Sequence, residues 1–295
     1  MPKIHIITDA DLDGAGSYLC LKYAYENASI SYSVTTEKKF LTDVASSFKF
    51  NDYDLVIISD LNLKEDEIKL CDLKNVIIVD HHKEHTELIN NYKNAKPIIK
   101  DYTSCTKLIY DTFKLEGKLN KNQKLLIKLI DDYDSYTLSL PFSKPLNQVF
   151  WSYTGDRVNK FEQDFKDGFF GFNQFHKNAL KIIENKIDSF FKEEPINFGN
   201  IKIGGNDYNV AGVMVTFSPN EIAENIIKKY KVDFVIMINI KGKSVYMRRG
   251  KECTLNMGKL ASKLIEGGGH EDAAGGILND SIINITKFLK PINEK

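Results

Sequence analysis

The chain of 295 residues lacks several features that would place it in particular classes of protein. It has no run of about 18 apolar residues, which is the length that a transmembrane helix requires. Its first residues lead directly into an apolar run of strand length, and no secretory signal precedes that run. We therefore expect a cytoplasmic protein. The 40 basic and 40 acidic side chains leave no net charge, so the composition gives no general argument for binding to nucleic acid.

Cysteine is also scarce and shows no functional spacing. The four cysteines are Cys20, Cys71, Cys105 and Cys253, and they form neither a close pair nor a zinc-binding pattern. We expect all four to be reduced and buried. Hydrophobic residues make up 42% and charged residues 27% of the chain, which excludes disordered, collagen-like and coiled-coil proteins.

The first 135 residues alternate short apolar runs with helical patterns. The runs at 53–59 and 76–79 do not alternate with polar residues, which is typical of strands buried on both faces. Helical patterns cover 17–27, 103–113 and 121–130. This order predicts a parallel α/β sheet, whose chemistry lies at the carboxyl ends of its strands.

A second domain is expected after a predicted helix at 178–192. New strand patterns follow that helix, at 201–203, 208–215, 234–240 and 244–247. We predict domains at residues 1–193 and 197–295, the second a smaller mixed α/β unit. Residues 196–295 hold 14 basic and 10 acidic side chains, whereas the rest of the chain holds 26 and 30. This division suits metal binding in the first domain and anion binding in the second.

Three aspartates, Asp9, Asp11 and Asp13, follow the first predicted strand and precede Gly14. Their alternate spacing predicts that they point to one side. Carboxylates this close repel one another, and a divalent cation with oxygen ligands relieves that repulsion. An aspartate-rich turn that caps a helix would explain the same residues.

Two further strand ends favour the metal site. Asp60 ends the strand at 53–59, and Asp80-His81-His82 ends the strand at 76–79. A fourth acidic group, at 131–134, follows a helical pattern. Because the carboxyl ends of parallel strands meet at one edge of a sheet, we expect these side chains to lie close together.

Four motifs follow one another along the chain: Asp-x-Asp-x-Asp-Gly, the strand-end aspartate, Asp-His-His and a later aspartate. Their order and residues resemble the motifs of the DHH phosphoesterase superfamily. The segment GGGHEDAAGG at 267–276 is similar to the signature of the DHHA1 domain that follows in such proteins. The resemblance extends over almost the whole chain. It implies an α/β fold in which a parallel-sheet DHH domain precedes a smaller mixed α/β DHHA1 domain.

The resemblance implies two metal ions, usually Mn²⁺, with Mg²⁺ as an alternative. Their ligands would be one histidine and five aspartates: Asp9, Asp11, Asp13, Asp60, His81 and Asp132. Asp60 would bridge the ions, with Asp9 and Asp11 completing one site and the other three completing the second. Asp131 and Asp134 remain alternatives to Asp132. Many members have histidine where this chain has Asp9, whereas RecJ-type exonucleases have aspartate, a hard ligand that favours Mn²⁺ or Mg²⁺.

Two such ions would activate a water molecule for in-line attack on phosphorus. His82 would face the scissile phosphate as a hydrogen-bond donor or acid, and a role in orienting a metal ligand is its alternative. His5, inside a strand, is expected to be structural. His176 has no acidic neighbour in sequence and is expected at the surface.

Candidate substrate-binding residues lie in the second domain: Arg248, Gly267, Gly268, Gly269 and His270. Consecutive glycines let backbone N–H groups approach an anion, although a tight turn would also explain them. Arg248 matches a strand arginine that contacts substrate phosphate in the family, and Arg249 is the alternative. Phe150, Trp151 and Tyr153 could stack on bases, but such aromatic residues more often pack in a core, so they receive no assignment.

The predicted function is a Mn²⁺-dependent exonuclease, similar to nano-RNases, that releases mononucleotides from short oligonucleotides. Its partners would be short single-stranded RNA or DNA, or small nucleotides, and the oligomeric state stays open between monomer and homodimer. The absence of a long basic track favours short substrates. The alternatives are a RecJ-like single-stranded DNA exonuclease, a dinucleotide phosphodiesterase or phosphoadenosine phosphate phosphatase, and an inactive member that only binds.

Overall fold

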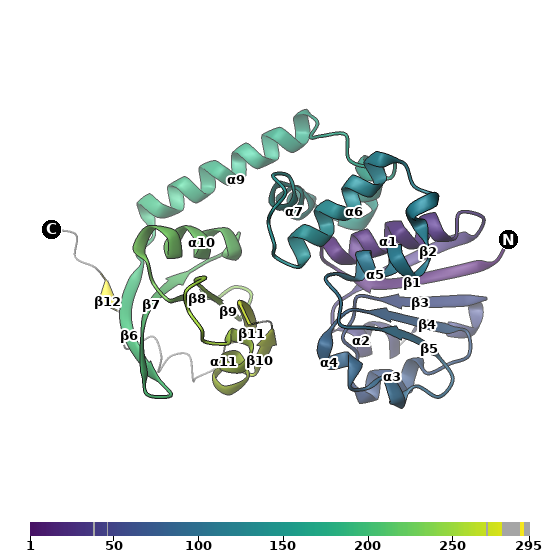
Figure 1. The fold of residues 1–295 in the computed structure, drawn as a ribbon, viewed down its shortest axis with the longest axis horizontal. Coiled ribbons are helices and arrows are strands. Elements are labelled where there is room, and N and C mark those ends of the chain that lie inside the picture. Colours follow the sequence, from purple (N-terminus) through teal and green to yellow (C-terminus); the bar gives the residue numbers. More distant parts are fainter. Residues whose placement is uncertain (38, 46, 270, 279–289, 292–295) are drawn as a thin grey trace. The chain divides into compact units, whose positions relative to one another are not determined.

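The chain is divided into two structural units, Met1–Lys181 and Ile182–Lys295 (Figure 1). The computed structural model describes residues 1–37, 39–45, 47–269, 271–278 and 290–291. The division falls inside helix α9 (Gln174–Glu193), which contributes residues to both units. The domain ranges 1–193 and 197–295 stay predictions. Within the described residues, no helix has the length and apolar character needed to cross a membrane.

The first unit is built on a five-stranded parallel sheet with the order β2-β1-β3-β4-β5. Its strands are β1 (Lys3–Asp9), β2 (Ser29–Thr35), β3 (Leu55–Ser59), β4 (Val76–Asp80) and β5 (Lys96–Ile99). Thr8 pairs with Ser59 of β3 and with Val34 of β2, so the carboxyl ends of these strands are level. The predicted parallel α/β sheet is confirmed, with β5 as a strand that the sequence analysis missed.

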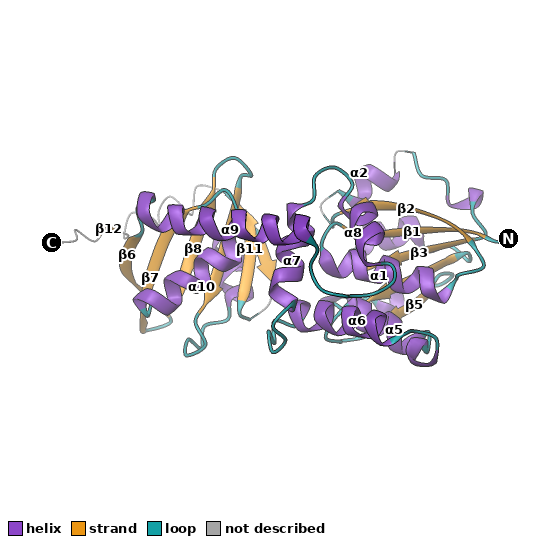
Figure 2. Cartoon of the chain, turned by 90° about the horizontal axis from the view of Figure 1, so that it is seen from above, coloured by secondary structure: helices purple, strands orange, loops and turns teal. Residues whose placement is uncertain are grey.

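Helices cover both faces of this sheet (Figures 1 and 2). The helices that pack on one face are α1 (Leu12–Ala24), α5 (Cys105–Thr112), α6 (Lys121–Asp134), α7 (Ser143–Ser152) and α8 (Arg157–Phe165). The other face carries α2 (Phe40–Ala45), α3 (Glu65–Cys71) and α4 (Lys83–Thr86). Three 3₁₀ turns complete the unit: Phe50–Asp52, Ile89–Asn91 and Leu115–Gly117. Because neighbouring strand residues face opposite sides, Ile57 and Ile58 belong to different cores.

The second unit has a mixed sheet with the order β10-β11-β9-β8-β7-β6-β12. Its strands are β6 (Asn197–Ile203), β7 (Asn206–Met214), β8 (Phe234–Asn239), β9 (Ser244–Arg249), β10 (Gly267–Gly269), β11 (Ala273–Ile277) and β12 (Lys290–Pro291). Its helices are α10 (Pro219–Tyr230) and α11 (Met257–Leu264). Strands β7 and β8 are parallel, and the other neighbouring pairs are antiparallel. This confirms the predicted mixed α/β unit.

The turn between β1 and α1 depends on Gly14. Asp11 caps α1 and accepts a hydrogen bond from the Gly14 N–H at 2.9 Å. Thr8 Oγ1 donates to the Gly14 carbonyl oxygen, also at 2.9 Å. A Cβ atom at Gly14 would lie 2.2 Å from the carbonyl oxygen of Asp9, so the turn has no room for a side chain. Because of this cap, α1 begins at Leu12 rather than at the predicted residue 17.

We predict that Gly14→Ala destabilises the first unit by about 2 kcal/mol or more, because the new methyl group collides with backbone atoms that cannot move freely. Urea unfolding followed by the fluorescence of Trp151, the single tryptophan of the chain, measures this change. Gly117→Ala is the matched control, since a Cβ atom there meets nothing within 4 Å. The control should stay within about 0.5 kcal/mol of the wild type. Equal stability of the two variants would contradict the packing argument.

Candidate metal centre

Three of the predicted ligands meet where β1, β3 and β4 end. Asp60 directly follows β3, His81 directly follows β4, and Asp13 lies in the first turn of α1. His81 Nε2 lies 3.4 Å from Asp60 Oδ1 and 3.9 Å from Asp13 Oδ2, and all three residues are buried. The sequence predicted that the three aspartates alternate as in a strand, but β1 ends at Asp9. Asp13 reaches this position because it lies in the first turn of α1.

The structure brings Asp134, rather than Asp132, to this cluster. Asp134 Oδ2 lies 3.6 Å from His81 Nε2. The carboxylate of Asp132 instead accepts hydrogen bonds from the N–H and hydroxyl of Ser139 and from the N–H of Leu140. Asp132 therefore holds the turn after α6.

Helix geometry explains why Asp134 reaches the site. Asp134 follows the buried residues Ile127 and Ile130 by seven and four positions, so it continues the face of α6 that packs in the core. Asp131, three residues earlier, accepts hydrogen bonds from the hydroxyls of Thr103 and Ser104, which precede α5. Asp132 is also buried, three residues after the buried Leu129, so apolar periodicity alone does not separate it from Asp134, and only their side-chain contacts do.

Potential ligand atoms form two tight groups that share His81. One group contains Asp60, His81 and His82, and the other contains Asp13, His81 and Asp134, with the atoms of each group within 4.8 Å of one another. Asp9 and Asp11 belong to neither group. Asp9 is the last residue of β1, and its carboxylate accepts a hydrogen bond from the Ala10 N–H, whereas Asp11 caps α1.

The carboxylates of this site repel one another in a buried setting. Burial and the neighbouring charge of Asp11 raise the pKa of Asp9 to about 8. Burial and the charge of Asp13 raise the pKa values of Asp11, Asp60 and Asp134 above their usual range, with burial as the largest cause. A cation or a bound proton placed among these carboxylates would therefore be stabilised.

Asp60 has an unusual backbone conformation. Its φ is 60°, in the left-handed region that glycine adopts most easily, although aspartate tolerates it better than most residues. The Asp60 N–H donates to the Val79 carbonyl oxygen at 3.0 Å, which ties the end of β3 to β4. Backbone strain of this kind occurs where the position of a side chain matters for function.

Asp13 is fixed by the start of helix α5. Its two carboxylate oxygens accept hydrogen bonds from the N–H groups of Cys105, at 2.6 Å, and Thr106, at 3.0 Å. The N–H groups of a first helical turn have no partner within the helix and favour an anion. This contact therefore holds the Asp13 carboxylate at the base of the cluster.

His81 is oriented by the backbone. Its Nδ1 lies 3.3 Å from the carbonyl oxygen of Tyr102, which can only accept, so Nδ1 donates to it and Nε2 faces the carboxylates. Burial alone would lower the pKa of His81, but the hydrogen bond to Asp60 and the charges of Asp60 and Asp13 raise it to about 11. A positively charged imidazole thus offsets part of the negative charge of these carboxylates.

Asp80 holds the second histidine of the motif. Its fully buried carboxylate accepts from His82 Nδ1 at 2.8 Å and from His85 Nδ1 at 2.7 Å, while His85 Nε2 contacts the hydroxyl of Tyr92 at 2.8 Å. Burial opposes the charge of Asp80, but both histidines lower its pKa below the usual range. His82 is therefore held through Nδ1, which leaves Nε2 as the ring nitrogen that Asp80 does not hold.

These residues fit a divalent cation of the Mn²⁺ or Mg²⁺ type. The donors are mainly carboxylate oxygens with one or two imidazole nitrogens, which such hard ions prefer, and among the described residues neither ligand group includes a cysteine. Nearby Cys105 does not change this conclusion, because burial raises the pKa of its thiol well above the usual value. A cation would also relieve the repulsion between the carboxylates.

In the second unit, Arg248 is buried and points within its own domain. It is 4% exposed, and its Nη1 donates to Asn220 Oδ1, near the start of α10, at 2.9 Å. Arg249 is paired with Asp272 at 2.6 Å and with Glu271 at 3.6 Å. Neither arginine projects freely into solvent in this arrangement.

The glycine-rich segment forms a hairpin of β10 and β11, in which the glycines differ in their packing. A Cβ atom at Gly267 would lie 2.2 Å from the Gly275 carbonyl oxygen, and one at Gly269 would lie 2.6 Å from that of Ala273. Gly268 is exposed and has open space on its Cβ side among the described residues. Close strand packing thus accounts for Gly267 and Gly269 but not for Gly268. His270 lies outside the described residues.

Two expectations about single residues are settled by burial. His176 is 2% exposed and contacts the Asp164 carboxylate at 2.9 Å, so the expected surface position is wrong. The aspartate reaches it from helix α8, which sequence proximity does not indicate. Phe150 and Tyr153 pack in the core, whereas Trp151 is 49% exposed.

Two family models match the chain. The DHH family, N-terminal domain, matches residues 3–133, and the DHHA1 domain matches residues 218–295. Together they cover well over half of the chain. No curated protein matches the sequence.

Solved structures share the fold at low sequence identity. A pGpG-specific phosphodiesterase, PggH from Vibrio cholerae, is 15% identical with a TM-score of 0.58, and the match covers 96% of both chains. An exopolyphosphatase-related protein from Bacteroides fragilis is 12% identical with a TM-score of 0.53, over 97% of this chain and 90% of the other. RecJ from Thermus thermophilus, in complex with Mn²⁺, is 12% identical with a TM-score of 0.53, but the match covers only 51% of the RecJ chain.

The motifs at the sheet edge, the order of the two units and both family models agree with one another. This chain belongs to the DHH superfamily of phosphoesterases, with a DHH domain followed by a DHHA1 domain.

Proposed function

We propose that this chain hydrolyses the phosphodiester bonds of short oligonucleotides and releases mononucleotides, with two Mn²⁺ ions at the cluster around His81. The observation that carries this proposal is the set of three carboxylates, from Asp13, Asp60 and Asp134, that face His81 Nε2 at 3.4–3.9 Å. Mg²⁺ is the alternative ion.

The proposed ligands are one histidine and five aspartates: Asp9, Asp11, Asp13, Asp60, His81 and Asp134. Asp134 takes the role that the sequence assigned to Asp132, because the Asp132 carboxylate is occupied by Ser139 and Leu140. Asp60 is the proposed bridge, since the backbone at the end of β3 fixes it in a strained conformation. When bound, the ions supply Lewis acidity that makes water a nucleophile near neutral pH and offsets the charge developing on the phosphoryl group.

His82 is the proposed donor to the scissile phosphate. Asp80 holds its Nδ1 and raises its pKa against the opposing effect of burial, so the imidazole keeps a proton to donate. The side chain is 23% exposed, and Nε2 is the ring nitrogen that Asp80 does not hold. The role of His82 as an orienting residue remains the alternative, because His82 also belongs to one of the two ligand groups.

Short substrates are favoured by two observations. The chain has no net charge, whereas a processive single-strand nuclease is favoured by a net excess of basic residues along its binding track. The PggH structure, similar over nearly the whole chain, is named for its specificity for pGpG, a dinucleotide. For substrate contacts in the second unit we propose Arg248 and the hairpin glycines, and among the glycines Gly268 has the most open surroundings.

A RecJ-like single-stranded DNA exonuclease is the second candidate. It is favoured by the aspartate at position 9, the residue type found there in RecJ-type enzymes, and by the similar fold of RecJ with Mn²⁺. A dinucleotide phosphodiesterase would use the same centre and differs only in the length of its substrate.

We predict that Asp134→Asn weakens Mn²⁺ binding, measured by calorimetric titration, by at least about tenfold, because a carboxylate facing His81 loses its charge. Mn²⁺-dependent hydrolysis should fall with it. Asp132→Asn is the matched control on the same helix. It should lower stability by about 1–3 kcal/mol through the loss of hydrogen bonds to the following turn, while metal affinity is kept. If Asp132→Asn weakened Mn²⁺ binding and Asp134→Asn did not, Asp132 would be the ligand.

Substrate length separates the candidates. With Mn²⁺ and end-labelled RNA and DNA from dimers to about 25 nucleotides, the long end exceeding a single-strand footprint, we expect rates to collapse beyond a few nucleotides. Product analysis would then show mononucleotides. Sustained degradation of the longest DNA would instead support the RecJ-like function. Hydrolysis of pyrophosphate to inorganic phosphate, with no cleavage of the oligonucleotides, would contradict both.

A further inference from the structure

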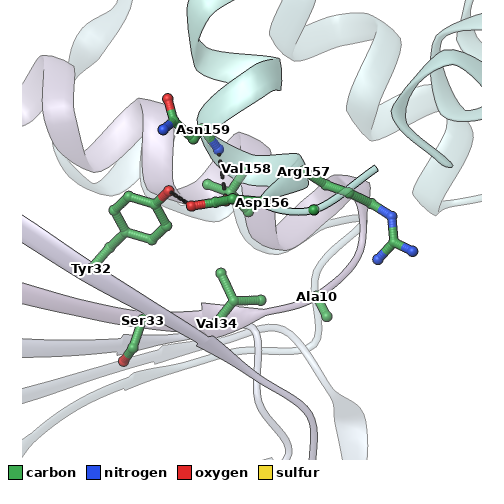
Figure 3. Close-up of a pocket in the computed structure, with 9 residues that line it drawn as sticks. Ala10, Tyr32, Ser33, Val34, Asp156, Arg157, Val158 and Asn159 are labelled. Atoms are coloured by element: carbon green, nitrogen blue, oxygen red, sulfur yellow. Dashed lines mark hydrogen bonds between the residues drawn. The ribbon is translucent and has the colours of Figure 1, made fainter. Parts of the chain in front are cut away.

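A cavity opens beside the loop that carries the first aspartates (Figure 3). It lies within the first unit and has a volume of about 520 Å³. Its walls are Ala10, residues 32–34 of β2 and residues 155–159 at the start of α8. This volume lies within the range of small-molecule sites. Because Ala10 stands between Asp9 and Asp11, a ligand in this cavity would lie against the loop of the proposed metal centre.

Contacts within the first unit hold one wall of the cavity in place. The Tyr32 hydroxyl donates to the carboxylate of Asp156, and the Asn159 N–H donates to the same carboxylate at 3.0 Å. A carboxylate has about four acceptor positions, so Asp156 keeps capacity for N–H donors of a ligand. Val34, 37% exposed, adds an apolar surface between Tyr32 and Ala10.

Arg157 places a positive charge at the same cavity. It is the single arginine of residues 1–181. Its guanidinium carbon lies 4.8 Å from the ring centre of Trp151, a geometry of cation–π stacking. Within the described part of the chain no carboxylate forms an ion pair with it, and its buried Nε has no hydrogen-bond partner. In Figure 3 its side chain extends on the Ala10 side, whereas Tyr32 lines the opposite side.

The cavity thus combines a negatively charged group, Asp156, and a positively charged group, Arg157, with an apolar surface at Val34. A carboxylate that accepts hydrogen bonds and an apolar surface suit a nucleobase with N–H donors. An unpaired guanidinium suits a phosphate, for which arginine is the preferred partner. Both features occur together in a nucleotide, whereas a free phosphate would use only the second.

We infer that this cavity binds one nucleoside of the substrate, with Arg157 contacting the adjoining phosphate. This inference rests on the proposed function, since it names the part of the oligonucleotide that the first unit recognises. It also gives a role to the exposed Trp151, which holds the guanidinium by stacking.

Trp151 makes the inference measurable without turnover, because it is the single tryptophan of the chain. The full chain is titrated with GMP, AMP and inorganic phosphate in the absence of divalent metal, and Trp151 emission is recorded. We expect a saturable change with a nucleotide and a weaker one with phosphate. Arg157→Gln should weaken nucleotide binding by at least about tenfold, since a charge-assisted contact is lost.

Two further variants complete the titration. Val34→Phe fills the cavity while it keeps Arg157 and adds no tryptophan, and it should weaken nucleotide binding as well. Lys124→Gln is the matched control, since it removes a cation that pairs with Glu116 on the surface of the same unit. Equal responses to phosphate and nucleotide would reduce the cavity to an anion site and overturn the nucleoside assignment. Unchanged binding in both Arg157→Gln and Val34→Phe would overturn the inference entirely.

Turnover provides the second readout and separates the two proposals. The ratio of kcat/KM for a dinucleotide to that for bis-p-nitrophenyl phosphate, which has no nucleoside, should fall at least about tenfold in Arg157→Gln, mainly through KM. A fall of kcat on both substrates with unchanged KM would contradict the binding role. If the wild type hydrolyses neither substrate, the proposed function fails, and the fluorescence titration still decides what the cavity binds.

Discussion

Electrostatic repulsion among buried carboxylates is the constraint on which the rest of the first unit depends. Asp13, Asp60 and Asp134 surround one imidazole nitrogen, and burial raises the pKa values of Asp60 and Asp134. Such a cluster opposes folding unless positive charge balances it. The protein tolerates the cluster because each side chain is held by a separate element of the fold. Binding of divalent cations, as proposed, would balance this charge.

Contacts with neighbouring elements fix the orientation of the side chains in the cluster. The first turn of α5 binds Asp13, the Tyr102 carbonyl orients His81, and Asp80 fixes His82. Asp131 ties the end of α6 to the residues that precede α5. These contacts fix the orientation of the side chains, which lowers the cost of assembling a metal site.

Much of this arrangement is readable from the sequence, because it follows from strand patterns and short motifs. The apolar runs predict β3 and β4, and the rule that strand ends meet at one edge predicts the proximity of Asp60 and His81. Four features escape this reasoning. The four-residue strand β5 has too little pattern, the position of Asp13 depends on where α1 begins, and the choice of Asp134 depends on the phase of α6. The buried pair of His176 and Asp164 depends on a tertiary contact that no local pattern encodes.

The most direct test of this account is a Mn²⁺ titration of the full chain followed by electron paramagnetic resonance. Two ions that share Asp60 would lie about 3.5–4 Å apart, so their spins would couple. The account predicts two bound ions per chain and a spectrum of a coupled pair at saturation. Binding of no ion, or of a single uncoupled ion at saturating Mn²⁺, would contradict the proposed two-metal centre.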